Sequence, residues 1–294
     1  MNNEEKKTSE QQSEVRTPFK EFLRKFSKQK TAVVAAVILI AIVLTAIFAD
    51  VIAPYGINDY DYSVCLKGPS KEHIFGTDEF GRDIFSRIVY GTRISLSIGF
   101  GAVTAAAVLG SLLGLIAGYY GGWIDEIISR ICDVLFAFPG LILAIAIVAI
   151  LGPGLYNVVI AVVVFRTPTF CRLVRGETLQ CKNSVFVQAA KSIGAPDSRL
   201  LLRHILPSAI PSVIVQYSTS IGGSIMTAAS LSFLGMGAAP PTPEWGLMLS
   251  NARTYVFMCW HYAVFPGLAI FITVLCFNLV GDGLRAALDP KLSE

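Results

Sequence analysis

Long apolar runs separated by short polar segments dominate the hydrophobic pattern of this sequence. Crossing a bilayer takes roughly 17 to 25 predominantly apolar residues. The pattern therefore predicts an all-α integral membrane protein with about six transmembrane helices, near residues 31–53, 93–118, 128–151, 155–171, 208–236 and 262–283. Only 15% of the 294 residues are charged, whereas soluble domains carry about 25%, so the composition supports a surface that faces lipid.

The distribution of lysine and arginine predicts the orientation. Eight of them precede residue 31 and six lie in 172–207, but the predicted loop 237–260 contains only Arg253. Cytoplasmic loops are the lysine- and arginine-rich ones, so both termini and 172–207 are expected to be cytoplasmic. The predicted divisions are a cytoplasmic tail (1–30) with an amphipathic interfacial helix at 17–28, a first transmembrane helix (31–53), an extracytoplasmic loop (54–92), a transmembrane core (93–285) and a cytoplasmic tail (286–294).

Two features inside the predicted spans leave alternatives open. The second span has small residues at every fourth position, which lets helix backbones approach closely, either within the subunit or against a partner. The fifth span has four polar residues on one face, which either line a path for a polar solute or bond to neighbouring helices. The small residues are Ala102, Ala106, Gly110, Gly114 and Gly118, and the candidate pathway-lining residues are Gln216, Ser220, Ser224 and Thr227.

Two ionisable residues fall inside the predicted spans, and such residues are functional hypotheses by default. Asp133 lies in the third span and Arg166 near the cytoplasmic end of the fourth. Our interpretation favours a structural explanation for both. Arg130 is at helical spacing from Asp133 and is expected to pair with it, and the long Arg166 side chain is expected to reach the headgroups.

The cytoplasmic segment 185–207 predicts a helix–turn–helix between two spans, which we call the elbow. Glycine adopts the left-handed conformation at helix C-termini at little cost, so a first helix is expected to end at Gly194. Pro196 suits the opening of a second helix, expected to run to Pro207. From local physics alone, the elbow could equally be an ordinary cytoplasmic loop.

The order of residues in the elbow resembles the EAA loop of binding-protein-dependent ABC import permeases. Gln188-Ala189-Ala190 is followed after three residues by Gly194 and later by Leu206-Pro207. In that family the loop docks into the cytoplasmic ATPase, so the resemblance implies an ATPase-coupling role for these six residues. Two departures are glutamine at 188 in place of glutamate and His204 in place of isoleucine.

Further motifs resemble the C-type permeases of dipeptide, oligopeptide, nickel and glutathione importers. They include His73–Asp78, Gly81-Arg82-Asp83, Asp133–Pro139 and Pro240–Gly246, and the resemblance covers about residues 16–292. It implies a type I ABC importer permease fold in the bacterial cytoplasmic membrane and ATP-driven import of peptides or glutathione by alternating access. It also places the outer loop near the substrate-binding protein. The candidate docking residues are Phe75, Gly76, Asp78, Gly81, Arg82 and Asp83.

The implied partners are a homologous second permease, two cytoplasmic ATPases that hold ATP and magnesium, an extracytoplasmic binding protein and the lipid bilayer, with no nucleic acid. The chain has no GxxxxGK[ST] phosphate loop and no nucleophile–base set, so it is not expected to be an enzyme or to bind a cofactor. His73, Asp78 and Asp83 are interleaved with glycines and arginine, which favours a turn over a metal site. A nickel-type permease and, less favoured, an ion-coupled secondary transporter remain alternatives, although no internal repeat supports the latter.

Overall fold

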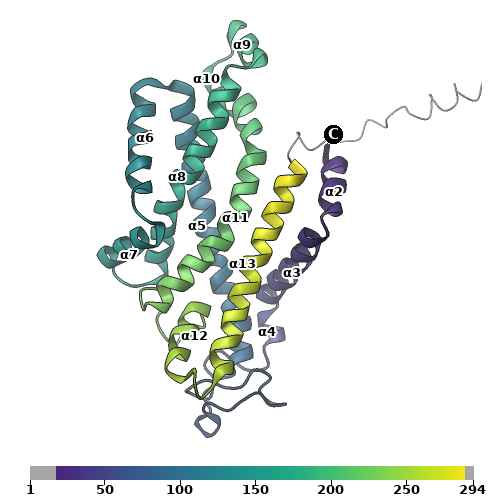
Figure 1. Ribbon diagram of the computed structural model, residues 1–294, viewed down its shortest axis with the longest axis vertical. Coiled ribbons are helices and arrows are strands. Elements are labelled where there is room, and N and C mark those ends of the chain that lie inside the picture. Colours follow the sequence, from purple (N-terminus) through teal and green to yellow (C-terminus); the bar gives the residue numbers. More distant parts are fainter. Residues whose placement is uncertain (1–17, 289–294) are drawn as a thin grey trace, which may run out of the picture.

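The computed structural model describes residues 18–288, and its long helices run between two ends of the molecule (Figure 1). The elbow lies at one end and the segment between α4 and α5 lies at the other. In chain order, the helices are α2 (Pro18–Lys28), α3 (Lys30–Ile47), α4 (Ala49–Ile52), α5 (Ile84–Tyr120), α6 (Gly122–Phe136), α7 (Gly140–Leu151), α8 (Leu155–Lys182), α9 (Val185–Ser192), α10 (Asp197–Arg199), α11 (Leu206–Phe233), α12 (Trp245–Ala252) and α13 (Trp260–Leu288).

Five of these helical stretches are long and apolar enough to cross a membrane by themselves: α3, α5, α8, α10 to α11, and α13. They confirm the predicted spans but extend several of them. α5 begins nine residues before the predicted start at residue 93, and α8 continues eleven residues beyond residue 171. Helices can project into water at both ends, so hydropathy finds the apolar centre of a span and not its bounds.

The third predicted span, 128–151, is not one helix. α6 and α7 are separated by three residues and bent by 94° relative to each other. Pro139 lies at the break with a non-helical ψ of 128°. Proline lacks an amide hydrogen and disfavours helical geometry at the residue before it. The apolar run therefore forms a broken span, and counting the pair as one gives six.

The small-residue stripe of α5 packs within the subunit, against α8. A β-carbon on Gly110 would lie 2.5 Å from the Thr167 carbonyl oxygen, and one on Gly118 would lie 2.7 Å from the Thr178 β-carbon. Ala102 and Ala106 are fully buried. The absence of larger side chains lets the two longest neighbouring helices approach closely, which decides between the two alternatives left open by the sequence.

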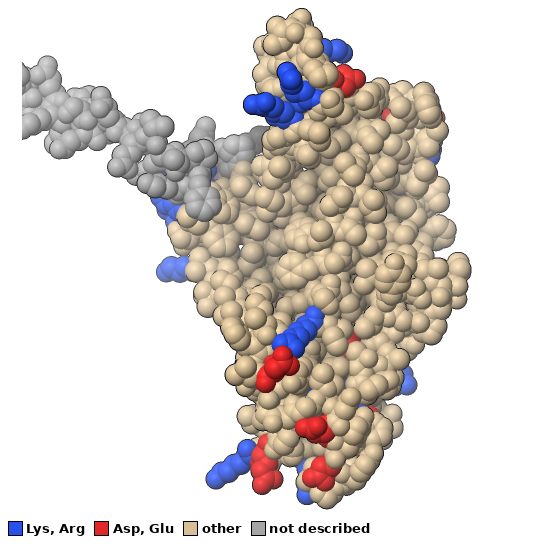
Figure 2. Space-filling view, turned by 180° about the vertical axis from the view of Figure 1, so that it is seen from behind, with Lys and Arg blue, Asp and Glu red and all other residues tan. Residues whose placement is uncertain are grey.

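The two ends of the described chain meet at the elbow end of the molecule. α2 packs beside the last turns of α13, where the Phe26 ring and Ala32 lie against Gly283. α2 matches the amphipathic helix predicted at 17–28, except that Thr17 lies outside the described residues. Figure 2 shows charged side chains gathered mostly toward the two ends, with a broad band of uncharged side chains between them.

Candidate functional site

The first half of the elbow has the predicted geometry. α9 ends in a turn in which Gly194 has a φ of +80°. The Ala195 amide donates to the Ala190 carbonyl at 3.1 Å and the Gly194 amide donates to that of Lys191 at 3.0 Å. This pairing satisfies carbonyls at the helix end. Gly194 is exposed, with no atom near the position of a β-carbon, so backbone conformation alone accounts for a glycine here.

α9 has one buried side and one exposed apolar side. Val187 is 3% exposed and packs with Leu115, Val174 and Leu200 beneath the elbow. On the opposite side, Phe186 and Ile193 are 53% and 86% exposed. The motif residues Gln188 and Ala189 are exposed as well, whereas Ala190 is half-buried. The result is an exposed apolar surface at the elbow end of the molecule, and such surfaces mark interaction sites.

Sequence reasoning missed Val185, Phe186 and Ile193 as members of this surface. They share a face with Ala189 at helical spacing, and Val185 is also strongly exposed. The sequence contained a signal for this surface. Val185, Phe186 and Val187 are consecutive large apolar residues in the eight-residue helix α9, and consecutive residues of a helix cannot all face one buried side. The EAA-like motif of the elbow indicated Gln188 and Gly194 instead.

The second half of the elbow differs from the prediction. A helix does begin after Pro196, but it does not stop at Pro207. α10, a π-helical turn over Leu200–Ile205 and α11 form a continuous stretch from Asp197 to Phe233. Proline is accepted in the first turn of α11 because amides there need no partner within the helix. Leu206 is half-buried and Pro207 exposed, so the elbow is joined directly to a membrane-spanning helix.

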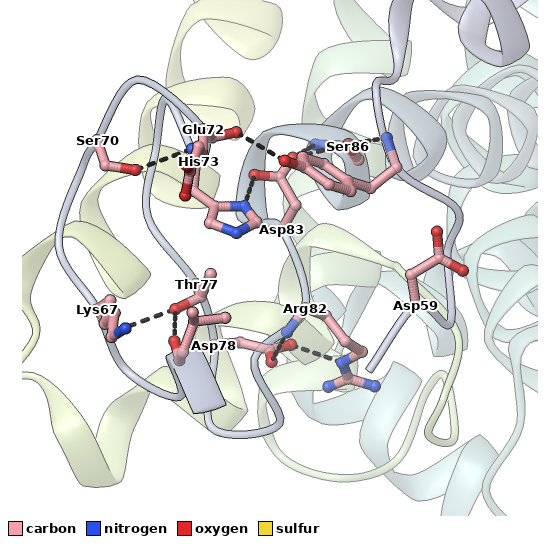
Figure 3. Close-up of polar contacts among 12 residues, drawn as sticks. Asp59, Lys67, Ser70, Glu72, His73, Thr77, Asp78, Arg82, Asp83 and Ser86 are labelled. Atoms are coloured by element: carbon pink, nitrogen blue, oxygen red, sulfur yellow. Dashed lines mark hydrogen bonds and ion pairs between the residues drawn. The ribbon is translucent and has the colours of Figure 1, made fainter. Parts of the chain in front are cut away.

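The outer loop is held by two carboxylates (Figure 3). Asp78 Oδ2 lies 2.7 Å from Arg82 Nε, and Asp78 Oδ1 accepts the amides of Phe80 and Arg82 at 2.9 Å each. Asp83 caps α5 by accepting the Ser86 amide at 2.8 Å, and it lies 3.0 Å from His73 Nδ1. Asp83 and His73 therefore contact each other, whereas Asp78 belongs to a separate contact with Arg82, and among the described residues the three groups do not form a metal-binding cluster.

Most of the predicted docking residues are buried in the interior of this loop. Asp78 is fully buried and Arg82 is 2% exposed, while Gly76, Gly81 and Asp83 are also buried. Phe75 is half-buried and stacks on Phe265 with ring centroids 4.0 Å apart. These residues give the loop its shape and present almost no surface to a partner. The exposed large side chains of the same loop are Tyr60, Tyr62, Ile74 and Phe80.

A second segment at the outer end contains the Pro240–Gly246 motif. Glu244 caps α12 by accepting the amides of Gly246 and Leu247 at 3.0 and 2.8 Å. Burial raises the pKa of the Glu244 carboxyl, and these two amides act in the opposite direction. The Trp245 indole nitrogen donates to the Ile88 carbonyl at 3.1 Å. The motif therefore anchors α12 to α5.

The four polar residues of α11 do not form one open stripe. Ser220 and Ser224 are buried, whereas Gln216 and Thr227 are half-buried. Gln216 donates to Ser220 at 3.0 Å, and Thr227 donates to the Gly223 carbonyl of its own helix at 2.9 Å. Within residues 18–288, none of the hydrogen bonds of these four side chains reaches another helix. Gln216 alone lines a cavity, of about 310 Å³, beside α8 and α13.

The expected pairing of Asp133 with Arg130 was wrong, whereas the reach of Arg166 to the headgroups stays a prediction. Asp133 pairs with Arg172 of α8 at 2.9 Å, whereas Arg130 lies 4.0 Å from Glu126. Arg166 lies 16 residues before Lys182, where α8 ends, and it contacts Gly223 near the middle of α11. The sequence interpretation placed Arg166 near a helix end because the predicted span stopped at residue 171.

Similarity to known proteins agrees with this architecture. Residues 110–294 match the family described as binding-protein-dependent transport system inner membrane component, and residues 17–69 match the N-terminal transmembrane domain of oligopeptide transport permease C. A glutathione transport system permease protein GsiD from Pectobacterium atrosepticum is 55% identical over 281 residues, covering 95% of this chain and 93% of the relative. A GsiD from Escherichia coli is 58% identical over 280 residues, covering 95% and 92%.

Solved structures share the fold at low sequence identity. An inward-facing MetNI methionine ABC transporter matches with a TM-score of 0.55 and 18% identity, covering 68% of this chain and 96% of that chain. An amino acid ABC transporter crystallised with histidines matches with a TM-score of 0.53 and 16% identity, covering 67% and 92%.

The family assignment follows from matches along nearly the whole chain, and it accounts for the absence of a phosphate loop. Family members work with ATPase and binding-protein partners, and the chain is not itself an enzyme. This chain belongs to the binding-protein-dependent transport family as an oligopeptide-permease-C-type, multi-pass inner-membrane permease subunit of an ABC importer.

Proposed function

We propose that this subunit imports glutathione or closely related short peptides by alternating access, together with a homologous second permease. The cargo class is supported by relatives that are 55% and 58% identical over 95% of the chain and are named as glutathione permeases. Both termini and the elbow face the cytoplasm in this proposal. The lysine and arginine distribution supports that orientation.

The exposed apolar face of α9 is the observation that carries the coupling part of the proposal. Each permease inserts this face into one of two ATPases, and Gln188, Ala189, Ala190, Gly194, Leu206 and Pro207 form or position it. Because the second half of the elbow continues into α11, a displacement of the elbow is passed along one helix to the middle of the membrane. ATP binding to the ATPases and docking of the loaded binding protein then shift the same equilibrium between two conformations of the permease.

At the outer end, the binding protein contacts the exposed side chains Tyr60, Tyr62, Ile74 and Phe80. The predicted docking residues Phe75, Gly76, Asp78, Gly81, Arg82 and Asp83 serve this contact by holding the loop that presents those side chains. Their burial supports this division, since a fully buried carboxylate has no surface for a partner.

Uptake of labelled glutathione, a dipeptide, an oligopeptide and nickel tests the function directly. Cells with the gene, without it, and with Gly194→Arg are compared before and after ATP depletion. We expect glutathione uptake to require the gene, ATP and an intact Gly194, with nickel uptake unaffected. ATP-independent uptake, or unchanged uptake of all four solutes without the gene, would contradict the proposal.

A further inference from the structure

Arg166 is a charged side chain deep in the transmembrane region that the coupling and docking surfaces do not use. It lies on α8, about 24 Å of helix rise from the cytoplasmic end. Its guanidinium lies against Gly223 of α11, where a β-carbon would be 3.4 Å from Arg166 Cζ and would overlap with Nη2. Arg166 lies within the apolar part of α8, which ends near residue 171.

The Arg166 guanidinium has no acidic partner within residues 18–288. Its Nε atom is buried without a hydrogen-bond partner, and its guanidinium carbon lies over the Phe165 ring, 4.9 Å from the ring centroid. The other arginines nearby on α8 are paired: Arg172 with Asp133 at 2.9 Å, and Arg175 with Asp125. An unpaired charge inside a membrane is costly, and such residues mark substrate and ion pathways.

A partly polar strip of the α8–α11 contact lies between Arg166 and the elbow end of the subunit. Arg166, Leu173 and Glu177 share one face of α8, and this face meets α11 at Gly223 and Ser212. The Ser212 hydroxyl donates to Glu177 at 2.6 Å. Gln216 lies seven residues, about 10 Å of helix, from Gly223. The cavity of about 310 Å³ occupies the cytoplasmic part of this strip, lined by Leu173, Pro211, Ser212, Val215, Gln216, Arg285 and Leu288.

The buried Ser224 hydroxyl is the neighbouring feature on α11. It is fully buried and, among the described residues, lacks a hydrogen-bond partner. Ser224 follows Gly223, the residue that the guanidinium contacts. Arg166 Nε and Ser224 Oγ are therefore two buried polar atoms near the same turn of α11 that have no hydrogen-bond partner among the described residues.

We propose that Arg166 receives a carboxylate of the cargo midway across the membrane, at the inner end of the α8–α11 strip. A guanidinium presents a planar set of donors that matches both oxygens of a carboxylate. Peptides with a free C-terminus carry such a group, and glutathione carries two. The inference rests on the proposed function and names the chemistry that the membrane subunit itself recognises.

The test uses the complete importer in proteoliposomes, with saturating loaded binding protein so that delivery is not limiting. Uptake of glutathione and a dipeptide is compared with uptake of the same dipeptide as its C-terminal amide. We expect Arg166→Gln to lower uptake of the free acids at least tenfold, to spare the amide, and to leave thermal stability unchanged or higher. Arg166→Lys should restore part of the uptake. Arg172→Gln is the matched control on the same helix and should not discriminate between acid and amide.

Several results overturn the inference. Equal losses for acid and amide would assign Arg166 a structural role. Unchanged uptake of the acids would remove it from the path. Loss of the second permease on co-purification of Arg166→Gln would show that its carboxylate partner belongs to that subunit. A wild-type complex that carries the amide as fast as the acid overturns this inference alone, whereas one that carries no peptide or glutathione overturns the proposed function as well.

Discussion

The elbow and the outer loop use their motif residues in opposite ways. In the outer loop, Asp78 and Arg82 are buried and pair with each other, Asp83 is buried against His73 and Ser86, and the exposed surface consists of other side chains. In the elbow, Gln188, Ala189 and Gly194 are exposed, and the anchor is Val187. The same kind of sequence signal therefore marks a structural frame at one end and a contact surface at the other.

The difference has a physical cause in what surrounds each segment. Only a 3₁₀ turn, Tyr62–Val64, provides regular structure between α4 and α5, so side chains satisfy many of the backbone groups there. The elbow is helical, and its backbone bonds are satisfied within α9 and the turn after it. Its side chains are left free to face a partner. Substitutions in the outer loop should therefore mainly lower stability, whereas substitutions in the elbow should mainly lower transport activity.

Removing the central carboxylate of the outer loop should have the largest effect on stability. Asp78→Ala leaves the buried Arg87 without its acid and leaves Arg82 with only Glu79, 3.9 Å away, and breaking a buried ion pair costs about 3–5 kcal/mol. We expect low membrane yield and a lowered melting temperature of the purified subunit. Glu72→Ala, an exposed acid in the same loop, should change stability by less than about 0.5 kcal/mol. Equal stability of the two variants would contradict a structural role for Asp78.

Removing the cap of α5 should have an intermediate effect. Asp83→Ala takes away the acceptor for the Ser86 amide, and losing such a cap costs about 0.5–2 kcal/mol. Asp83→Asn keeps an acceptor in place and serves as the control that separates capping from charge. Thermal unfolding of both variants measures the difference. If asparagine were as harmful as alanine, the charge and the His73 contact would matter more than the cap.

Gly194→Arg should abolish transport activity at only a small cost in stability. Forcing a side chain into a positive φ costs about 1 kcal/mol, and the surrounding space is open. We expect a folded subunit with no uptake and weakened ATPase co-purification. Gly235→Arg is the matched control, because Gly235 also follows a helix end with a positive φ and open space but lies outside the elbow. Retained uptake and co-purification in Gly194→Arg would show that the elbow is not the coupling element.

Ile193→Ser should have the smallest effect on stability, within about 0.5 kcal/mol, because the side chain is almost fully exposed. Its association with the ATPase should nevertheless weaken, since the apolar contact surface becomes polar. Ile74→Ser, an exposed isoleucine of the outer loop, should leave ATPase association unchanged. Detergent-solubilised co-purification measures both. Indistinguishable ATPase association in the two variants would remove Ile193 from the docking surface.

The sequence by itself determined the features that depend on local composition and local geometry. Apolar run length identified the spans, because a bilayer requires a minimum of apolar residues. The positive φ of Gly194 was predictable from the helix end that precedes it, since few other residues adopt that conformation. The order of motifs was sufficient to predict the family to which the chain belongs.

Only the tertiary structure decided which side chains meet across the fold. Hydropathy averaged over the break at Pro139, so a bent pair was predicted as one helix. Helical spacing suggested Arg130 for Asp133, but the partner is Arg172, 39 residues away on another helix. The burial of the outer-loop motif residues and the lack of an acidic partner for Arg166 among the described residues could not be predicted from the sequence either. Contacts between distant residues depend on how helices pack together, and a local pattern specifies which residues are close along a helix but not which helix lies beside it.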